Sequence, residues 1–310
     1  FGTMGFLGST TKGYGSPEIN KVSYGLIAYE IESIDSSYRS AISVQSSLVC
    51  YPIELFGSDN QKKEYLPDLI KGNIVGCFGL TESEAGSDPS SMKTSYKKEN
   101  DHYIINGTKN WITNAPIADL FLIWALNEKK EINLFLIPKN TKGLSISLIE
   151  NKTSLKISPT GQITLNNVKI PKDFMLPNTN GWKSVFSCLN NARYGIAWGV
   201  MGAATNAWLI SKEYTENRIM FKKPLASTQL IQKKLANMQT EISLGLSACI
   251  HAGRSIDRGK DLKIAISMLK RNNCYKALKI VREARDMMGA NGLLEEYHIM
   301  RHLVNLETVK

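Results

Sequence analysis

The sequence predicts an α+β protein in three consecutive parts: a helical domain, an antiparallel β domain and an antiparallel helical bundle. Apolar residues recur at helical spacing in the first part, and short alternating runs with turn signals replace them from about Val75. The helical period returns after Gly181 and holds to the end. We place the domains at 1–74, 75–178 and 179–310. No G-x-G-x-x-G segment follows a predicted strand, so a Rossmann fold is not expected.

The first part contains two recognisable helix signals. Ser16–Glu18 combines an N-cap residue with a proline at the first helical position, which predicts a helix start there. Apolar residues continue at helical spacing over Val22–Ile31. Ser58 is followed by an amphipathic segment that ends at Gly72, which predicts a second, capped helix.

The β domain is predicted from short apolar runs with turn residues between them. The runs are Tyr103–Ile105, Leu120–Trp124, Leu134–Ile137, Leu144–Leu148 and Ile163–Val168. The turn signals are Asn106-Gly107, Lys142-Gly143 and Asn166-Asn167. Five short strands joined by hairpins predict a compact antiparallel sheet or barrel. The last part contains long predicted helices at Asn191–Asn217, Leu225–Gly259 and Asp261–Met288, which favour an antiparallel bundle.

Charge and hydropathy exclude several classes of function. The net charge of +10 is spread along the chain instead of clustered, so we expect no nucleic-acid partner, although a basic surface suits a ligand that carries a pyrophosphate. The longest candidate, Ala118–Leu126, has nine residues and contains Asp119, whereas a membrane span needs about 18 apolar residues. We therefore expect no membrane insertion.

Cysteine and histidine spacing points away from disulfides and metals. The five cysteines form no C-x-x-C pair and their number is odd, which indicates a reducing compartment. His298 and His302 are four residues apart on a predicted helix, but the H-E-x-x-H pattern is absent. We interpret them as two exposed helical histidines and predict no metal site.

Two segments of the β domain carry the most chemical information. Gly76–Asp88 is rich in glycine, hydroxyl and small residues, so it is either a plain turn or a loop that brings backbone N–H groups to a flat polar ligand. Asn110–Asn114 contains Trp111, and a tryptophan is most often a core residue. The two segments together, in this order and about thirty residues apart, resemble the signatures of the acyl-CoA dehydrogenase family.

The resemblance implies FAD as the cofactor. It implies that Trp111 and Thr113 flank the flavin ring and hydrogen-bond its N5 side. The cofactor-binding residues implied in the two segments are Phe78, Leu80, Thr81, Gly86, Ser87, Trp111, Ile112 and Thr113.

Later segments resemble the same family. Arg218 would meet the FAD pyrophosphate, and Phe221 and Gln229 would contact the cofactor from a neighbouring subunit, although Lys222 replaces a usual glycine. Asp286–Gly292 resembles the turn that takes the adenosine half of FAD, although a plain helix C-cap explains its glycines equally well. The cofactor-binding residues implied there are Asp286, Met288, Gly289 and Ala290.

The CoA and acyl-tail positions resemble those of glutaryl-CoA dehydrogenases within the family. Leu189–Gly199 resembles their CoA-binding segment, which implies substrate contacts from Asn190, Asn191, Arg193 and Tyr194, with Ser87 at the thioester. Tyr38–Ala41 resembles their acyl-tail signature, which places Arg39 and Ser40 at the end of the substrate.

An arginine at the acyl tail has a simple physical purpose. A dicarboxylic acyl-CoA brings a free carboxylate into an apolar pocket, and an unpaired buried carboxylate is very costly. Arg39 offers a bidentate fork, and Glu32, seven residues earlier, would share its face on a continuous helix and orient the guanidinium. The alternative is an exposed Asp35–Arg39 pair, which contributes about 0.3–0.5 kcal/mol to stability and has no function.

The resemblance implies FAD-dependent α,β-dehydrogenation of glutaryl-CoA, followed by decarboxylation to crotonyl-CoA. The family's catalytic glutamate is expected just beyond Lys310, so we assign no catalytic residue and expect that the sequence lacks both ends and is inactive by itself. The implied partners are an electron-transfer flavoprotein as electron acceptor and further subunits in a dimer of dimers. The implied location is the cytoplasm in a bacterium or the mitochondrial matrix in a eukaryote. Two alternatives remain, a dehydrogenase for another short acyl-CoA and a non-catalytic flavin- or CoA-binding homologue.

Overall fold

The computed structural model describes all residues from Phe1 to Lys310. The chain divides into two compact units, which are described separately. The sheet unit consists of Phe1–Ile19, Ser40–Lys152 and Ser158–Ala192, and the bundle unit consists of Asn20–Arg39, Thr153–Ile157 and Arg193–Lys310. The predicted order of helices, strands and helices along the chain is confirmed.

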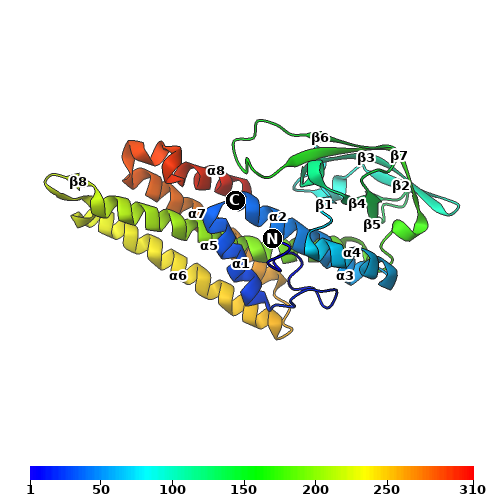
Figure 1. The fold of residues 1–310 in the computed structure, drawn as a ribbon, viewed down its shortest axis with the longest axis horizontal. Coiled ribbons are helices and arrows are strands. Elements are labelled where there is room, and N and C mark those ends of the chain that lie inside the picture. The colour runs from blue at the N-terminus through cyan, green and yellow to red at the C-terminus, as the bar shows by residue number, and fades with distance from the viewer. The chain divides into compact units, whose positions relative to one another are not determined.

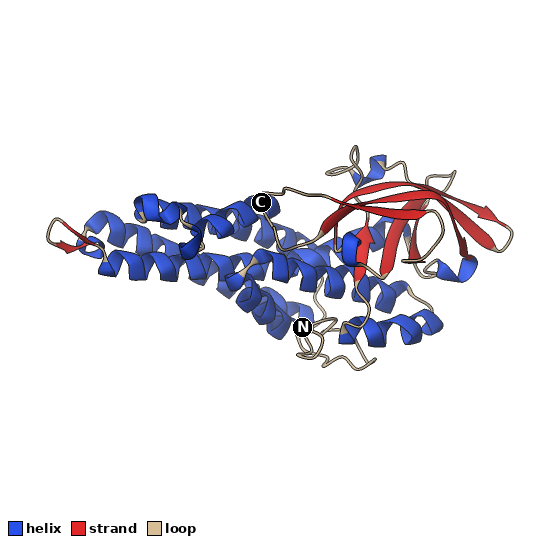
Figure 2. Cartoon of the chain, turned by 45° about the horizontal axis from the view of Figure 1, so that its top comes forward, coloured by secondary structure: helices blue, strands red, loops and turns tan.

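Seven strands form one twisted sheet in the sheet unit (Figure 2). The strands are β1 (Gly76–Gly79), β2 (Ser95–Glu99), β3 (His102–Thr113), β4 (Leu120–Leu126), β5 (Ile132–Pro138), β6 (Leu144–Leu148) and β7 (Thr160–Pro171). Hydrogen-bonded neighbours follow the order β1-β4-β2-β3-β7-β6. Strand β5 lies outside this order and pairs with β4. The sheet is mixed, because β4 runs parallel to β1 and β2 while the other pairs are antiparallel. The prediction of a purely antiparallel sheet is therefore wrong in detail, since the long connection from β1 to β4 allows the chain to return to the same end of the sheet.

Alternate residues of β4 serve two different cores. Leu122 and Trp124 pack with Ile53, Leu66 and their neighbours from the helices of this unit. Phe121 and Ile123 belong to a second cluster on the opposite face of the strand. All seven residues of β4 are buried, which explains why this strand is apolar throughout and does not alternate.

Two irregularities in the β3–β7 ladder correct two predicted turns. Asn106 of β3 faces both Asn166 and Asn167 of β7, and Asn167 N donates to Asn106 Oδ1 at 2.7 Å. Asn106-Gly107 and Asn166-Asn167 therefore form a β-bulge inside long strands, and neither is a hairpin turn. A second shift between Lys109 and Ile112 places the extra residue on β3.

The sheet unit also contains short helices. They are a π-helical turn at Val44–Cys50, α3 (Tyr51–Phe56) and α4 (Asp59–Lys71), and α2 (Ser36–Ser43) is divided between the two units. The predicted capping of α4 is confirmed, because Ser58 and Gln61 form a reciprocal capping box. Gly72 ends the helix with φ +78°, which is the left-handed conformation that glycine adopts most readily.

The bundle unit is built from long helices that run beside one another (Figure 1). They are α1 (Lys21–Ile34), α5 (Gly181–Asn217, in this unit from Arg193), α6 (Gln229–Asp257), α7 (Lys263–Met287) and α8 (Ile299–Val309). A small hairpin of β8 (Ile219–Met220) and β9 (Lys223–Pro224) joins α5 to α6. Met201, Ala204, Leu278 and Ile299 lie in the shared apolar core. None of the helices is both long and apolar enough to cross a membrane.

Two predicted helix starts need correction. The first helix begins at Lys21, where Asn20 accepts a hydrogen bond from Ser23 N at 2.8 Å, so the side-chain cap stands four residues after Ser16. Glu18 has φ +51° and lies in a loop, which a residue of the first helical turn cannot do. Helix α5 begins at Gly181, well before the predicted Asn191.

Candidate functional site

The first candidate cofactor segment, Gly76–Asp88, combines a strand with a turn. Its first four residues form the buried strand β1, so the expectation of a loop over the whole segment is wrong. Beyond β1, Glu82 and Ala85 exchange two backbone hydrogen bonds of 3.2 and 3.1 Å. This tight turn leaves Gly86 and Ser87 exposed.

The predicted flavin-lining residues of this segment differ in burial and in whether their polar groups have partners. Phe78 and Leu80 are buried in the core of the sheet unit, and the Phe78 ring packs edge-on against Trp124 with 6.2 Å between centroids. Thr81 is half-buried, and neither its hydroxyl nor that of Ser87 has a hydrogen-bond partner within the chain. Among the predicted flavin-lining residues of this segment, Thr81 and Ser87 therefore have side-chain polar groups left for a ligand.

The second candidate segment places an aromatic ring on the surface. Trp111 is 58% exposed, so its interpretation as a core tryptophan is wrong. It has φ +59°, a left-handed conformation that is rare for a bulky residue and that coincides with the extra residue on β3. Ile112 lies in the core, whereas Thr113 is half-buried and its hydroxyl has no partner in the chain. An exposed ring beside a free hydroxyl suits a flat, polar cofactor such as a flavin.

A cavity of the bundle unit contains Arg218. It has a volume of about 480 Å³, and Tyr214, Arg218, Asn291 and Tyr297 are among its lining residues. Asn291 Nδ2 donates to the Tyr214 hydroxyl at 2.9 Å, and the rings of Tyr214 and Tyr297 meet edge-on at 5.8 Å. The sequence interpretation missed both tyrosines, although Tyr214 lies one helical turn before Arg218. A cation beside aromatic rings and an amide suits a phosphate joined to a ring system.

The β8–β9 hairpin next to this cavity exposes Phe221, which is 87% exposed at the turn. Phe221 and Lys222 have φ of +51° and +64°, which is the pattern of a type I′ turn. The expected turn therefore forms although Lys222 replaces a glycine, at the cost of left-handed strain. Gln229 is exposed at the start of α6.

The last candidate cofactor segment, Asp286–Gly292, crosses the end of α7. Asp286 is paired with Lys234 at 2.5 Å, and this hydrogen bond lowers the pKa of its carboxyl group. Met288 is buried in the bundle core, so its side chain is not available to a ligand. Gly289 has φ +58° and Ala290 is exposed, which is compatible both with a cofactor turn and with a plain helix C-cap.

The predicted substrate residue Arg39 lies in a buried ion pair. Its Nε is 2.5 Å from Glu32 Oε2, and both side chains are almost completely buried. Ser36 Oγ donates to Glu32 Oε1 at 2.7 Å and fixes the other side of the carboxylate. Burial by itself lowers the pKa of Arg39, but the Glu32 carboxylate outweighs burial and the net pKa is raised. The two terminal nitrogens of Arg39 have no partner within the chain.

The alternative of an exposed Asp35–Arg39 pair is wrong. Asp35 is buried, and its carboxylate accepts from Asn305 Nδ2 at 3.2 Å and lies 3.3 Å from Arg301 Nε. The helix that was assumed to be continuous is interrupted, because α1 ends at Ile34 and Asp35 is extended. Glu32 and Arg39 meet despite this break.

A glycine on α5 makes room for the ion pair. A Cβ atom added at Gly199 would lie 2.0 Å from Glu32 Oε2 and 3.2 Å from Arg39 Cγ. No side chain larger than hydrogen therefore fits without moving the pair. The sequence interpretation did not single out Gly199 for this purpose, because the close approach of α1 to α5 is not visible in a sequence.

The remaining predicted substrate residues are half-buried or buried. Ser40, Asn190, Asn191 and Arg193 are half-buried. Tyr194 is buried, and its hydroxyl donates to the Lys21 carbonyl at 2.9 Å, so it already has a structural partner.

The interpretation of two exposed histidines is wrong for His302. His298 is exposed, but His302 is completely buried on α8, with Nε2 3.0 Å from Asn206 Oδ1. Burial lowers the pKa of His302 to about 4. No cluster of three or more histidine, cysteine or acidic side chains that could hold a metal is present.

Comparison with known proteins places this architecture. The chain matches the N-terminal, middle and C-terminal domain models of acyl-CoA dehydrogenases over residues 1–73, 77–168 and 179–309. The crystal structure of a glutaryl-CoA dehydrogenase from Mycobacterium smegmatis in complex with FADH2 is 43% identical, with a TM-score of 0.98 over 100% of this chain and 80% of that chain.

Relatives with lower sequence identity include acyl-CoA dehydrogenases that are not named for glutaryl-CoA. An acyl-CoA dehydrogenase of Bacillus subtilis is 32% identical over 94% of this chain and 78% of its own length. A short-chain specific acyl-CoA dehydrogenase of Megasphaera elsdenii is 32% identical over 91% of this chain and 75% of its own length. Because every part of the fold has its counterpart in these proteins, the chain belongs to the acyl-CoA dehydrogenase family of FAD-dependent oxidoreductases.

Proposed function

We propose that the protein oxidises glutaryl-CoA, a dicarboxylic acyl-CoA, between Cα and Cβ and then releases CO2 to leave crotonyl-CoA. The observation that carries this proposal is the half-used guanidinium of Arg39. Glu32 occupies its Nε edge, and the terminal nitrogens offer four N–H donors without an acceptor in the chain.

A carboxylate is the group that these donors fit best. The planar fork of arginine matches a carboxylate in a bidentate arrangement, and a charged partner is worth most where water is excluded. A monocarboxylic acyl chain ends in a methyl group and would leave the donors unsatisfied, which costs free energy. Arg39 therefore favours an acyl group with a distal carboxylate.

Each part of the chain has a role in this proposal. FAD, when bound, supplies the hydride acceptor. The exposed ring of Trp111 and the hydroxyls of Thr81 and Thr113 would hold the flavin, and Arg218 would meet its pyrophosphate. Arg39 would hold the far end of the substrate and so fix the position of Cα and Cβ.

The order of the two chemical events follows from electron delocalisation. Loss of CO2 leaves a carbanion, which is stabilised only when it is conjugated with the thioester through the new double bond. Oxidation therefore precedes decarboxylation. The dimer of dimers and the electron-transfer flavoprotein as acceptor remain predictions.

The test is the substrate preference of Arg39→Ala in the FAD-loaded enzyme. Removing one partner of a buried charge pair costs about 2–5 kcal/mol. We therefore expect kcat/KM for glutaryl-CoA to fall roughly 30- to 4,000-fold, while kcat/KM for butyryl-CoA changes little. Arg39→Lys should recover part of the glutaryl-CoA activity, because an ammonium cannot reproduce the planar fork.

An equal loss for both substrates would contradict the proposal. Arg39 would then be a structural residue, and the activity would be that of a dehydrogenase for another short acyl-CoA; the Megasphaera elsdenii relative is a short-chain specific acyl-CoA dehydrogenase.

A further inference from the structure

Between the two flavin segments of the sheet unit lies a buried ion pair that the sequence interpretation did not identify. Glu82 comes from the turn after β1, and Lys109 comes from β3, directly before the Asn110–Asn114 segment. We propose that Glu82 and Lys109 are positioning residues for the flavin, which lock the turn of the first segment onto the strand of the second. The inference rests on FAD binding by this unit and is independent of the acyl group that is oxidised.

Lys109 is fully buried and all of its donors are used. Its ammonium lies 2.9 Å from Glu82 Oε1, 3.0 Å from the Leu80 carbonyl and 3.6 Å from Met92 Sδ. A Cβ atom added at Gly79 would lie 2.5 Å from Ile123 Cδ1 and 3.3 Å from Lys109 Cγ, so the glycine leaves room for both side chains. The ammonium therefore holds the backbone of Leu80 as well as the carboxylate of Glu82.

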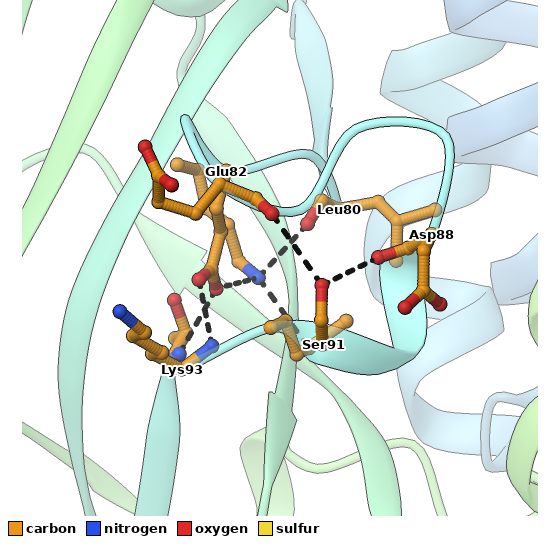
Figure 3. A network of polar contacts seen from close by, with 9 residues as sticks. Leu80, Glu82, Asp88, Ser91 and Lys93 are labelled. Carbon is orange, nitrogen blue, oxygen red and sulfur yellow. Dashed lines mark hydrogen bonds and ion pairs between the residues drawn. The ribbon is translucent and has the colours of Figure 1, made fainter.

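Glu82 extends the network to the next part of the chain. Its Oε2 accepts from Lys93 N at 2.7 Å and its Oε1 accepts from Thr94 N at 2.9 Å (Figure 3). One carboxylate thus joins the end of the first flavin segment, the start of β2 and the lysine of β3. Glu82, the Lys93–Thr94 backbone and Lys109 therefore meet at one buried carboxylate.

The residues that present groups to the flavin lie close to this pair in the chain, because Thr81 is next to Glu82 and Trp111 is two residues after Lys109. Thr81 lies between Leu80 and Glu82, and its carbonyl accepts from Asn110 N at 2.9 Å. Asn110 Oδ1 in turn accepts from Trp111 N at 3.0 Å, beside the left-handed turn of Trp111. A change in the Glu82–Lys109 distance would therefore move the Thr81 hydroxyl and the Trp111 ring relative to each other.

Burial gives this ion pair a desolvation cost. Burial lowers the pKa of Lys109 to about 8 even though Glu82 raises it. Burial raises the pKa of Glu82, but Lys109 and the backbone N–H groups outweigh burial and lower it, because they give its two oxygens three donors. Buried ion pairs can often be replaced by apolar residues without loss of stability. A pair that costs desolvation and fixes two ligand segments is best explained by the geometry that it imposes.

The experiment compares three variants of the FAD-loaded enzyme: Lys109→Met, Glu82→Gln and the double variant. The readouts are the affinity for FAD after flavin removal, the visible circular dichroism of the bound flavin, kcat, KM and the melting temperature. Lys172→Met is the matched control, because Lys172 pairs with Asp101 at 3.0 Å on the surface of the same unit.

We expect the single variants to lower both melting temperature and FAD affinity. The double variant should recover melting temperature, because no charge is stranded, but should keep the weakened FAD affinity, the altered flavin dichroism and a kcat about 10- to 100-fold lower, which is the cost of a misplaced reacting group. The ratio of glutaryl-CoA to butyryl-CoA activity should stay at its original value in every variant.

A double variant that binds FAD and turns over like the original enzyme would overturn the inference, because the pair would then serve stability alone. If the double variant does not fold, Lys109→Arg decides. This variant keeps the positive charge on a side chain of different length and shape. Unchanged flavin dichroism and kcat in it would also overturn the inference. Failure of the Arg39 test would leave these outcomes unaffected.

Discussion

The two glutamate-centred ion pairs buried in this protein differ in how much of the basic side chain is used. In the sheet unit, the ammonium of Lys109 has a carboxylate, a carbonyl and a thioether around it. In the bundle unit, the guanidinium of Arg39 has Glu32 on one nitrogen and no partner within the chain on the other two. The first pair is complete by itself, and the second is completed only by another acceptor.

The pKa directions follow burial and neighbouring charge, and they do not report how many donors are used. Burial lowers the pKa of Lys109, whereas at Arg39 burial is offset, chiefly by Glu32, and the pKa is raised. Lysine suits a closed network because its three donors radiate from one atom, and arginine suits a shared one because its fork has two separate edges. The completeness of a buried ion pair therefore separates a structural role from a ligand-binding role more clearly than its burial does.

The largest expected effect is a difference in rescue by ligand. Breaking either pair with Glu32→Gln or Glu82→Gln removes a buried counter-charge, which typically costs about 3–5 kcal/mol of folding stability. Glutaryl-CoA brings a new carboxylate to Arg39, so it should raise the melting temperature of Glu32→Gln more than that of the original enzyme. It should give Glu82→Gln no such extra increase.

Thermal unfolding of the FAD-loaded proteins, without electron acceptor and with each ligand in excess, measures this difference. Butyryl-CoA is the control, because it lacks the distal carboxylate and should stabilise all three proteins alike. Equal increments for glutaryl-CoA in the two variants would remove the distinction between a closed and an open pair.

A smaller effect is expected from Gly199→Ala on α5. The added Cβ would lie 2.0 Å from Glu32 Oε2, so the Glu32–Arg39 pair must move. Overpacking of this kind costs about 1–3 kcal/mol, and glutaryl-CoA turnover should fall more than butyryl-CoA turnover. Gly195→Ala, one turn earlier, is the control, because its Cβ would meet the Tyr24 hydroxyl at 3.0 Å. Loss of selectivity in both variants would show that α5 packing in general, and not the ion pair, sets substrate preference.

The smallest effect concerns a buried base that carries no charge. The pKa of His302 is about 4 in the folded protein and 6.5 ordinarily, so the unfolded chain binds more protons between these values. Stability should therefore fall as pH drops through this window, by roughly 1 kcal/mol at about pH 6. Denaturant titrations of the original protein and His302→Gln across this range measure the difference between their slopes. Parallel curves would mean that His302 does not contribute to the acid sensitivity.

The sequence predicted features that depend on local spacing. The helix cap at Ser58, the strand Leu144–Leu148 and the three-part order are all found where local patterns placed them. The Glu32–Arg39 contact also followed from spacing, although the helix that suggested it is broken at Asp35.

Features that depend on distant partners were missed or misread. The burial of His302 needs Asn206 on another helix, and the bulge at Asn106 needs two asparagines on β7. Lys109 was overlooked because a lysine next to a motif is ordinarily a surface residue, and its acidic partner is 27 positions away. Lys109 falls on the same alternation as the buried Tyr103 and Ile105 of β3, and this phase was the signal that could have found it.

The two irregularities of the β3–β7 ladder also constrain how this sequence can change in evolution. The first adds a residue to β7 at Asn166-Asn167, and the second adds one to β3 at Asn110-Trp111. The two additions cancel, so the register that pairs Ile105 with Val168 is restored where Ile112 pairs with Gly161. Loss of either extra residue alone would shift one end of the ladder by one position and exchange its inward and outward side chains. Insertions and deletions in these strands can therefore be accepted only as compensating pairs. Across homologues, we expect the extra residue of β3 near Trp111 and the extra residue of β7 at Asn166-Asn167 to be gained or lost together.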